Sequence, residues 1–242
     1  MSSTDKKVKK QKKIKKKGEG YDYFLYDFAK VTGIIPLMIW IRPKVYYPEG
    51  KPKVKGGFMI SSNHSSFIDP FAILAAFWYR RIFSLATKDL YDTPKKRWIF
   101  ENMRCIKVDK ENFSLDSFHE VTRRLKSGKV ICIFPEGQIN FESNDLLAFK
   151  SGVILMAHTA NVPIVPTYLA PVGKWYERRV MVVGQPINIR EICGFMPTID
   201  DLNRASDIVH NKEQELREFY YSKYNINSEP ASPEKNEEVI SK

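Results

Sequence analysis

The hydrophobic positions of the chain fall into short apolar runs separated by longer stretches with helical spacing. The short runs predict strands at residues 58–60, 82–87, 105–108, 130–134, 162–169 and 180–183, with another near 44–47. The longer stretches predict helices at 70–79, 94–101, 113–126, 149–160 and 202–220. Strands that alternate with helices predict an α/β fold, in which a mostly parallel central sheet is flanked by helices.

Composition divides the chain into parts. With 242 residues, 43% of them hydrophobic, the chain can bury one substantial core, which we place at residues 43–221. Residues 1–20 form a lysine-rich arm and residues 222–242 a polar tail, and we expect both to be disordered. Residues 21–42 lie between the arm and the predicted core domain.

Most of the net charge of +11 lies in the arm. Residues 1–17 contain nine lysines and one aspartate, so 30 basic and 27 acidic residues remain in the rest of the chain. The arm could contact anionic lipid or nucleic acid, or it could be a solubilising tail. We expect no nucleic-acid partner, because the mildly basic remainder contains no recognisable nucleic-acid module. A nucleic-acid binding protein that uses the arm is the alternative from another functional class.

The three cysteines indicate neither a disulfide framework nor a zinc site. Cys105, Cys132 and Cys193 are far apart and form no C-x-x-C pair. No secretory signal follows the lysine arm, because charged residues interrupt the segment after it. The sequence therefore predicts an intracellular, reduced protein.

Residues 21–42 predict a segment that lies on a membrane. The longest uncharged run, VTGIIPLMIWI at 31–41, has half the length that a helix needs to span a bilayer. Aromatic residues precede it, and Trp40 and Arg42 close it, as is typical of membrane interfaces. We predict one or two amphipathic interfacial helices, kinked near Gly33 and Pro36. A core helix packed on the domain is the alternative.

The stretch GFMISSNHSSFIDP at 57–70 carries the first candidate chemistry. An apolar strand ends in a polar turn that holds His64 and, five residues later, Asp69. If the intervening segment is a turn, the carboxylate can accept the imidazole N–H and leave the other ring nitrogen free to take a proton from a hydroxyl. The alternative is that Asp69 only caps the helix that begins at Pro70.

A second candidate loop follows the strand predicted at 130–134. In parallel sheets ligands bind at the carboxyl ends of the strands, so this FPEG turn and the His64 turn are expected at the same edge. Gly137 would let the backbone approach a ligand, and Glu136 could accept a hydrogen bond from a hydroxyl or hold a basic side chain. By itself, the tripeptide PEG after a strand is also a common turn.

Four blocks together resemble the glycerolipid acyltransferase superfamily, and within it the 1-acylglycerol-3-phosphate acyltransferases. They are NHSSFID (63–69), KVDK (107–110), FPEG (134–137) and VPIVP (162–166). The resemblance implies an acyltransferase fold and the transfer of an acyl group from a thioester to the free hydroxyl of 1-acylglycerol 3-phosphate, giving phosphatidic acid in phospholipid biosynthesis. It covers residues 21–190, and the joint occurrence of the blocks carries it.

The resemblance also assigns roles to residues. His64 and Asp69 correspond to the catalytic dyad, Lys110 to the basic residue that binds the acceptor phosphate, and Glu136 and Gly137 to the lining of the acceptor site. The chain departs from the usual F-P-E-G-T-R block, because Gln138 and Ile139 stand where the family has Thr and Arg. Lys88 or Lys150 could supply the missing phosphate contact.

Mechanistically, the dyad would act as a general base without an acyl-enzyme. No G-x-S-x-G elbow surrounds Ser65 or Ser66, which are the rival nucleophiles. We expect no metal and no cofactor beyond acyl-CoA or acyl carrier protein as co-substrate. The expected partners are a lysophospholipid, that donor and the cytoplasmic face of a membrane, bound peripherally or monotopically. The alternative acceptors are glycerol 3-phosphate and a lysolipid without phosphate.

Overall fold

The computed structural model describes residues 24–108, 114–141, 145–171 and 177–224. Within these residues the strands form one seven-stranded sheet in the order β1-β7-β6-β2-β5-β3-β4. The strands are β1 (Lys44–Tyr46), β2 (Phe58–Ser62), β3 (Ile82–Thr87), β4 (Ile106–Val108), β5 (Val130–Ile133), β6 (Ile164–Leu169) and β7 (Val180–Val183). All neighbours pair in parallel except β6 and β7, which are antiparallel. The predicted mostly parallel sheet is confirmed.

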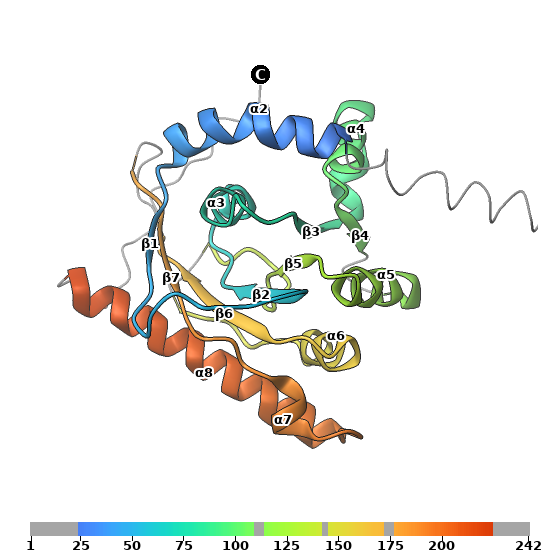
Figure 1. Ribbon diagram of the computed structural model, residues 1–242, viewed down its shortest axis with the longest axis vertical. Helices are drawn as coiled ribbons and strands as arrows, with labels where there is room; N and C mark the ends of the chain where they lie inside the picture. Colours follow the sequence, from blue (N-terminus) through green and yellow to red (C-terminus); the bar gives the residue numbers. More distant parts are fainter. Residues whose placement is uncertain (1–23, 109–113, 142–144, 172–176, 225–242) are drawn as a thin grey trace, which may run out of the picture.

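Helices cover both faces of the sheet (Figure 1). The helices are α2 (Phe24–Ile41), α3 (Asp69–Ala76), α4 (Pro94–Asn102), α5 (Leu115–Lys126), α6 (Gly152–Ala160), α7 (Ile189–Cys193) and α8 (Ile199–Tyr224), with a 3-10 turn η1 at Lys88–Tyr91. Helices α2 and α3 share one apolar cluster with β2, β5, β6 and β7. Helices α5, α6, α7 and α8 share another with β2 to β6.

The central strand β2 positions the predicted chemistry. All five of its residues are buried, which agrees with its place between β5 and β6. Ile60 pairs with Cys132 of β5 and with Val165 of β6, so the apolar run is covered on both sides. The position before β2 requires glycine, because a Cβ at Gly57 would lie 2.1 Å from the carbonyl oxygen of Leu125. The loops that leave β2 and β5 are therefore neighbours at one edge of the sheet.

Both ends of the terminal helix α8 differ from the sequence-based prediction. The terminal helix runs from Ile199 to Tyr224, beyond the predicted 202–220 and into the segment expected to be disordered from 222. Thr198 and Asp201 exchange side-chain and main-chain hydrogen bonds and so begin the helix early. At the other end, Tyr220 and Tyr224 pack against the rings of Tyr168 and Tyr46, which extends the helix across the sheet.

Smaller differences concern short elements. The 3-10 turn η1 and helix α7 were not predicted, and α6 begins at Gly152 instead of 149. Arg104 has a left-handed backbone, with φ of 55°, which is uncommon for a residue other than glycine. A short turn after a strand has too few residues for a hydrophobic period, so the sequence pattern does not reveal it.

Helix α2 packs on the domain by one side and exposes another. The hydroxyl of Tyr26 donates to the carbonyl of Ile82, and Arg81 pairs with Asp27. Several large apolar side chains are nevertheless exposed: Phe28, Val31, Met38, Ile39 and Trp40. A single helix with Pro36 inside it thus stands where one or two were predicted. Among the described helices, none combines the length and the apolar character needed to cross a bilayer.

The remaining predictions about the ends of the chain are not addressed by the structure. The lysine-rich arm at 1–20, residues 21–23 of the predicted interfacial segment and the tail from 225 to 242 lie outside the described residues. The interfacial role of residues 24–42 stays a prediction at this point.

Candidate functional site

The loop after β2 is anchored to the neighbouring strand by Asn63. Its amide oxygen accepts from the main-chain N–H of Leu169 at 2.7 Å, and its amide nitrogen donates to the carbonyl of the same residue at 2.9 Å. Both bonds are buried, so they hold the start of the loop against the end of β6. This fixes the backbone from which the next residue, His64, projects.

His64 and Asp69 form the predicted pair. The imidazole Nδ1 lies 3.0 Å from Oδ2 of Asp69, whose side chain is completely buried. The same oxygen accepts from the main-chain N–H groups of Ser65 at 2.8 Å and Ser66 at 2.7 Å. Three donors thus converge on one carboxylate oxygen. Nε2 of His64 makes no hydrogen bond to a described residue and remains free to accept a proton.

The capping alternative for Asp69 is not what the structure shows. Helix α3 begins at Asp69 itself, with Ile68 in the N-cap position and without a side-chain cap. The carboxylate turns back toward the preceding loop, where it accepts the hydrogen bonds of Ser65 and Ser66. The five-residue spacing therefore closes a turn in which the aspartate orients the histidine.

The loop after β5 lies directly beside this pair. The ring of Phe134 stacks on the imidazole of His64, with 3.9 Å between centroids and 15° between planes. The main-chain N–H of Asn140 donates to the carbonyl of His64 at 2.7 Å. The expected convergence of the two strand-end loops is confirmed by these contacts.

Gly137 adopts a conformation that favours glycine. Its φ is +73°, and a Cβ would lie 2.6 Å from Nζ of Lys150. The space above Gly137 is thus occupied by the side chain of Lys150, whose main-chain N–H also donates to the carbonyl of Pro135 at 3.0 Å. A predicted phosphate-binding lysine and a predicted lining glycine are in contact with each other.

Glu136 is buried, with 6% of its surface exposed. Burial raises the pKa of Glu136 to about 7; the main-chain N–H groups of His64 and Leu147 oppose the rise, and the charge of Asp69 adds to it. Its Oε2 has no hydrogen-bond partner among the described residues. Near pH 7 this carboxyl is therefore divided between its neutral and ionised forms, and one oxygen can receive a ligand.

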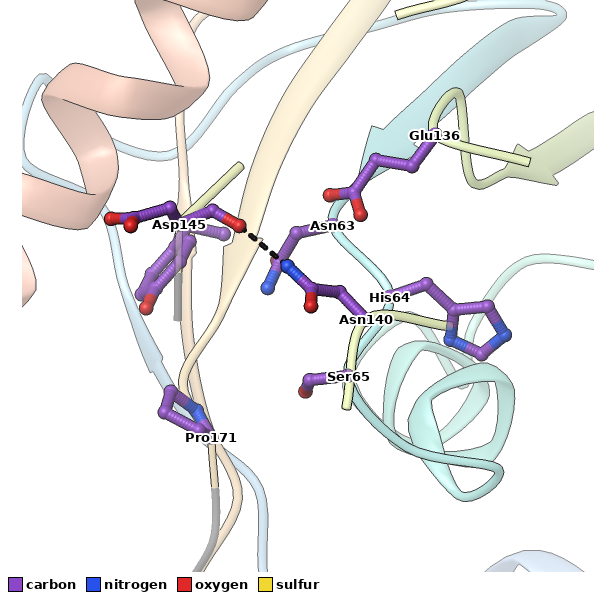
Figure 2. A pocket seen from close by; sticks show the side chains of 8 residues that line it. Asn63, His64, Ser65, Glu136, Asn140, Asp145 and Pro171 are labelled. Atoms are coloured by element: carbon purple, nitrogen blue, oxygen red, sulfur yellow. Dashed lines mark hydrogen bonds between the residues drawn. The ribbon is translucent and has the colours of Figure 1, made fainter. Parts of the chain in front are cut away.

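These side chains surround a small polar pocket of about 10 Å³. Figure 2 shows the carboxyl of Glu136 directed toward Asn63 and Asn140, while the imidazole of His64 projects away from the other labelled side chains. The pocket is lined by Asn63, His64, Ser65, Glu136, Asn140, Asp145, Tyr168 and Pro171. His64 and the hydrogen-bonding carboxyl of Glu136 thus line one polar space, and such neighbours can position a hydroxyl group close to a proton acceptor.

The structure describes two of the three lysines that were predicted to bind the phosphate. Lys110 lies outside the described residues, so its position relative to the dyad stays a prediction. Lys88 is exposed directly after β3, at the same edge of the sheet as the dyad but beyond β5. Lys150 is exposed and lies over Gly137. Of the two lysines that the structure describes, Lys150 is the one that reaches the loop after β5.

Two buried charged residues near the dyad were missed by the sequence analysis. Arg179, just before β7, lies with its guanidinium 3.7 Å from Oδ1 of Asp69. Glu213 of α8 is fully buried; the Ser61 hydroxyl and the Glu136 carboxyl are its polar neighbours, yet neither of its oxygens makes a well-formed hydrogen bond to a described residue. Both come from distant segments, so no local spacing connects them with the H-x-x-x-x-D block.

The other candidate groups have structural positions. His158 is buried in α6, and its Nε2 bonds to the carbonyl of Gly194 at 2.8 Å. Cys132 is completely buried in β5, and burial raises the pKa of its thiol. No group of three or more potential metal ligands occurs within the described part of the chain.

Comparison with known proteins places the chain among acyltransferases. The model of the family described as Acyltransferase matches residues 42–170, more than half of the 242 residues. A probable 1-acyl-sn-glycerol-3-phosphate acyltransferase of Mycoplasma pneumoniae is 30% identical over 57% of this chain and 54% of its own length. The 1-acyl-sn-glycerol-3-phosphate acyltransferase of Bacillus subtilis is 26% identical over 79% of this chain and 96% of its own. The chain thus spans about half the length of the Mycoplasma relative and nearly all of the Bacillus one.

The fold is also found in a solved structure. The crystal structure of the 1-acyl-sn-glycerophosphate (LPA) acyltransferase PlsC of Thermotoga maritima superimposes with a TM-score of 0.55, covering 79% of this chain and 83% of the other, at 20% identity. The likeness at this identity concerns the fold, namely the mostly parallel sheet with its flanking helices.

Proposed function

Because this chain belongs to the acyltransferase family, we propose that it transfers a fatty acyl group from a thioester donor to the free hydroxyl of 1-acylglycerol 3-phosphate, giving phosphatidic acid. The observation that carries the proposal is the hydrogen bond of 3.0 Å between Nδ1 of His64 and buried Asp69, beside a pocket that also contains Glu136. The names of the similar proteins from Mycoplasma pneumoniae and Bacillus subtilis support the same reaction.

In this reaction His64 is the general base. Asp69 accepts a hydrogen bond from Nδ1–H and so leaves Nε2 unprotonated and aimed away from the carboxylate. Nε2 takes the proton of the glycerol hydroxyl as its oxygen attacks the thioester carbonyl carbon. The carbon–sulfur bond then breaks, and the imidazolium returns the proton to the leaving thiolate. Atoms and charge balance without a covalent enzyme intermediate.

The neighbouring serines are poorly placed to be nucleophiles. The hydroxyl of Ser65 has no hydrogen-bond partner among the described residues, and that of Ser66 accepts from Arg179 at 3.3 Å. Neither hydroxyl is therefore bonded to His64, which would have to activate it. This favours direct transfer to the bound alcohol.

Acceptor binding is assigned to the loop after β5. Glu136 has an unpartnered oxygen in the pocket, which can accept a hydrogen bond from the acceptor hydroxyl or its glycerol backbone. The phosphate is assigned to Lys110 and Lys150, with Lys88 as a further contact. Lysine supplies a charge but not the planar fork of the arginine that Ile139 replaces, so electrostatic attraction holds the phosphate with less directional control.

The membrane is the proposed source of the acceptor. Helix α2 exposes Trp40, Ile39 and Val31 while its other side packs on α3, the helix that begins at Asp69. An exposed apolar side on a helix that is not long and apolar enough to cross a bilayer suits peripheral or monotopic attachment at the cytoplasmic face. The donor is acyl-CoA or acyl carrier protein, both of which present a thioester.

The decisive experiment is acyl transfer by the purified full chain. Acyl-CoA and acyl carrier protein are each supplied with lysophosphatidate in vesicles, and the lipid products are identified by mass. Phosphatidic acid is expected with wild-type protein, and His64→Ala is expected to lower kcat about 10²- to 10⁴-fold, which is the usual contribution of a general base.

Two controls complete this test. His119→Ala changes an exposed histidine on α5 and is expected to leave activity unchanged. Glycerol 3-phosphate and lysophosphatidylcholine replace the acceptor in parallel reactions, which tests the assignment of the phosphate-bearing lysolipid. Near-normal turnover by His64→Ala, or no acyl transfer to lysophosphatidate from either donor, would reject the proposed function.

A further inference from the structure

Arg179 makes the second set of contacts with the dyad. Its guanidinium lies 3.7 Å from Oδ1 of Asp69 and donates to the hydroxyl of Ser66 at 3.3 Å. Oδ1 has no hydrogen-bond partner within the described residues, whereas Oδ2 holds His64 and two main-chain N–H groups. Each oxygen of the carboxylate therefore faces a different charged or polar group, and Arg179 is the cation on the far side from the imidazole.

The surroundings of Arg179 leave little room for it to bind substrate directly. Only 11% of its side-chain surface is exposed, and Asp69 is completely buried. Burial lowers the pKa of Arg179, and the charge of Asp69 acts against that shift. A buried cation is stabilised by its partner carboxylate, so the arginine and the aspartate hold each other in place.

The backbone of Arg179 is tied to the end of α2. Its main-chain N–H donates to the carbonyl of Ile41 at 3.3 Å, and its own carbonyl accepts from the N–H of Lys44 at 2.8 Å. Ile41 is the last residue of α2 and Lys44 the first of β1. One residue thus touches the catalytic carboxylate by its side chain and the proposed membrane-facing helix by its main chain.

We propose that Arg179 is a positioning residue, which fixes the rotation of the Asp69 carboxylate from the side of α2 so that Oδ2 faces His64. The inference rests on the proposed function, because it assigns a role within that reaction. A carboxylate held on one oxygen only can rotate about its terminal torsion, which is broad. The guanidinium on Oδ1 opposes this rotation, so the imidazole keeps one tautomer and one direction.

The charged groups around His64 come from several elements. Asp69 lies at the start of α3, Glu136 in the loop after β5 and Arg179 before β7, and Glu213 of α8 lies behind Glu136. Removing the cation of Arg179 leaves three carboxyl groups and no described cation in contact with Asp69 other than the histidine. The acidic limb of the kcat profile is therefore expected to move to higher pH in Arg179→Met.

The test is a double-mutant cycle with Asp69. Arg179→Met is expected to lower kcat about 10- to 100-fold while the KM for lysophosphatidate changes less than about threefold, because a misaligned base impairs the chemical step more than binding. Asp69→Asn with Arg179→Met is expected to be no slower than Asp69→Asn alone, since the arginine acts through the aspartate. Arg179→Lys, which keeps the charge, should recover part of kcat.

Arg178 provides the matched control, because it is the adjacent arginine but is exposed. Arg178→Met is expected to keep the wild-type kcat and pH profile. If Arg179→Met fails to fold, the comparison of Arg179→Lys with wild type decides: an unchanged kcat overturns the inference. Independent losses that multiply in the double mutant, or a loss confined to KM, would also overturn it.

One readout needs no turnover and so separates this inference from the proposed function. The proton shared by His64 and Asp69 can be followed as a low-field NMR resonance that is absent in His64→Ala. It is expected to shift or broaden in Arg179→Met and to stay unchanged in Arg178→Met. An unchanged resonance in Arg179→Met contradicts the positioning role whether or not the wild-type protein transfers acyl groups.

Discussion

The two loops that form the site hold their carboxyl groups in different ways. In the loop after β2, Asp69 receives three hydrogen bonds on one oxygen and faces Arg179 with the other. In the loop after β5, Glu136 is also buried and accepts from the main-chain N–H groups of His64 and Leu147, but its Oε2 has no described hydrogen-bond partner and its pKa is raised to about 7. The cation beside Asp69 thus gives an anchored group in one loop, and a raised pKa without such a described partner gives an adjustable group in the other.

This difference separates two tasks of a transfer site. The base must keep one direction, because proton abstraction depends on alignment, and the loop after β2 provides rigid partners for it. The acceptor-binding group must exchange partners when substrate arrives, and an unpartnered oxygen can do so without first breaking a protein hydrogen bond. The following variants test this contrast, in decreasing order of expected effect.

The largest loss is expected from Asp69→Asn. An amide cannot balance an imidazolium as a carboxylate does, and its NH₂ group would face the donors of Ser65 and Ser66 if it rotated. We expect kcat to fall about 10²- to 10⁴-fold. Steady-state kinetics with lysophosphatidate measure this, and Asp92→Asn, at an exposed aspartate, serves as the control. A loss of kcat smaller than tenfold would mean that the activity of His64 does not depend on this carboxylate.

A smaller and pH-dependent effect is expected from Glu136→Gln. Since the pKa of Glu136 is about 7, the wild-type carboxyl is mostly protonated at pH 6 and mostly ionised at pH 8. The ionised form is the stronger hydrogen-bond acceptor, so acceptor binding should strengthen as pH rises. The wild-type to variant ratio of kcat/KM should therefore increase by about tenfold between these pH values.

The ratio is informative because other titrations cancel in it. The acceptor phosphate and His64 are present in both proteins, so their contributions divide out unless Glu136 interacts with them. Glu101→Gln, at an exposed residue of α4, is the matched control and should give a constant ratio. A ratio for Glu136→Gln that is equally constant from pH 6 to pH 8 contradicts the adjustable role.

The smallest effect is expected from Glu213→Gln, and it concerns stability. Burial raises the pKa of Glu213 well above its ordinary value, so the folded state keeps a proton that the unfolded state loses above about pH 4.5. Wild-type stability should therefore fall as pH rises above that value, whereas glutamine has no proton to lose. At pH 8.5 the variant should melt a few degrees higher than wild type, about 2–4 °C for each kcal/mol.

Thermal melts of both proteins from pH 5 to pH 8.5 measure this difference. Glu218→Gln, an exposed position on the same helix, should follow the wild-type curve throughout. A melting temperature of Glu213→Gln that lies below that of wild type by the same amount at every pH would contradict this expectation. Glu213 would then be stabilised by interactions that an amide cannot replace, and not destabilised by the loss of its proton.

Much of the fold could be predicted because its signals are local. Strands β2, β3 and β5 and helix α5 lie within a few residues of their predicted positions, since each is an apolar run or a helical period bounded by polar residues or glycine. Helix α7 and the ends of α8 were missed because α7 is only five residues long and the last turns of α8 depend on Tyr46 and Tyr168 from distant strands.

By itself, the sequence determined the chemistry at the strand ends: the spacing of His64 and Asp69, the FPEG turn and the parallel order that brings both to one edge. These depend on neighbours along the chain and on the handed rules of α/β sheets. The tertiary structure alone decided which buried charges accompany them. Arg179 and Glu213 reach the site across more than a hundred residues, and their burial and pKa shifts depend on surroundings that only folding creates.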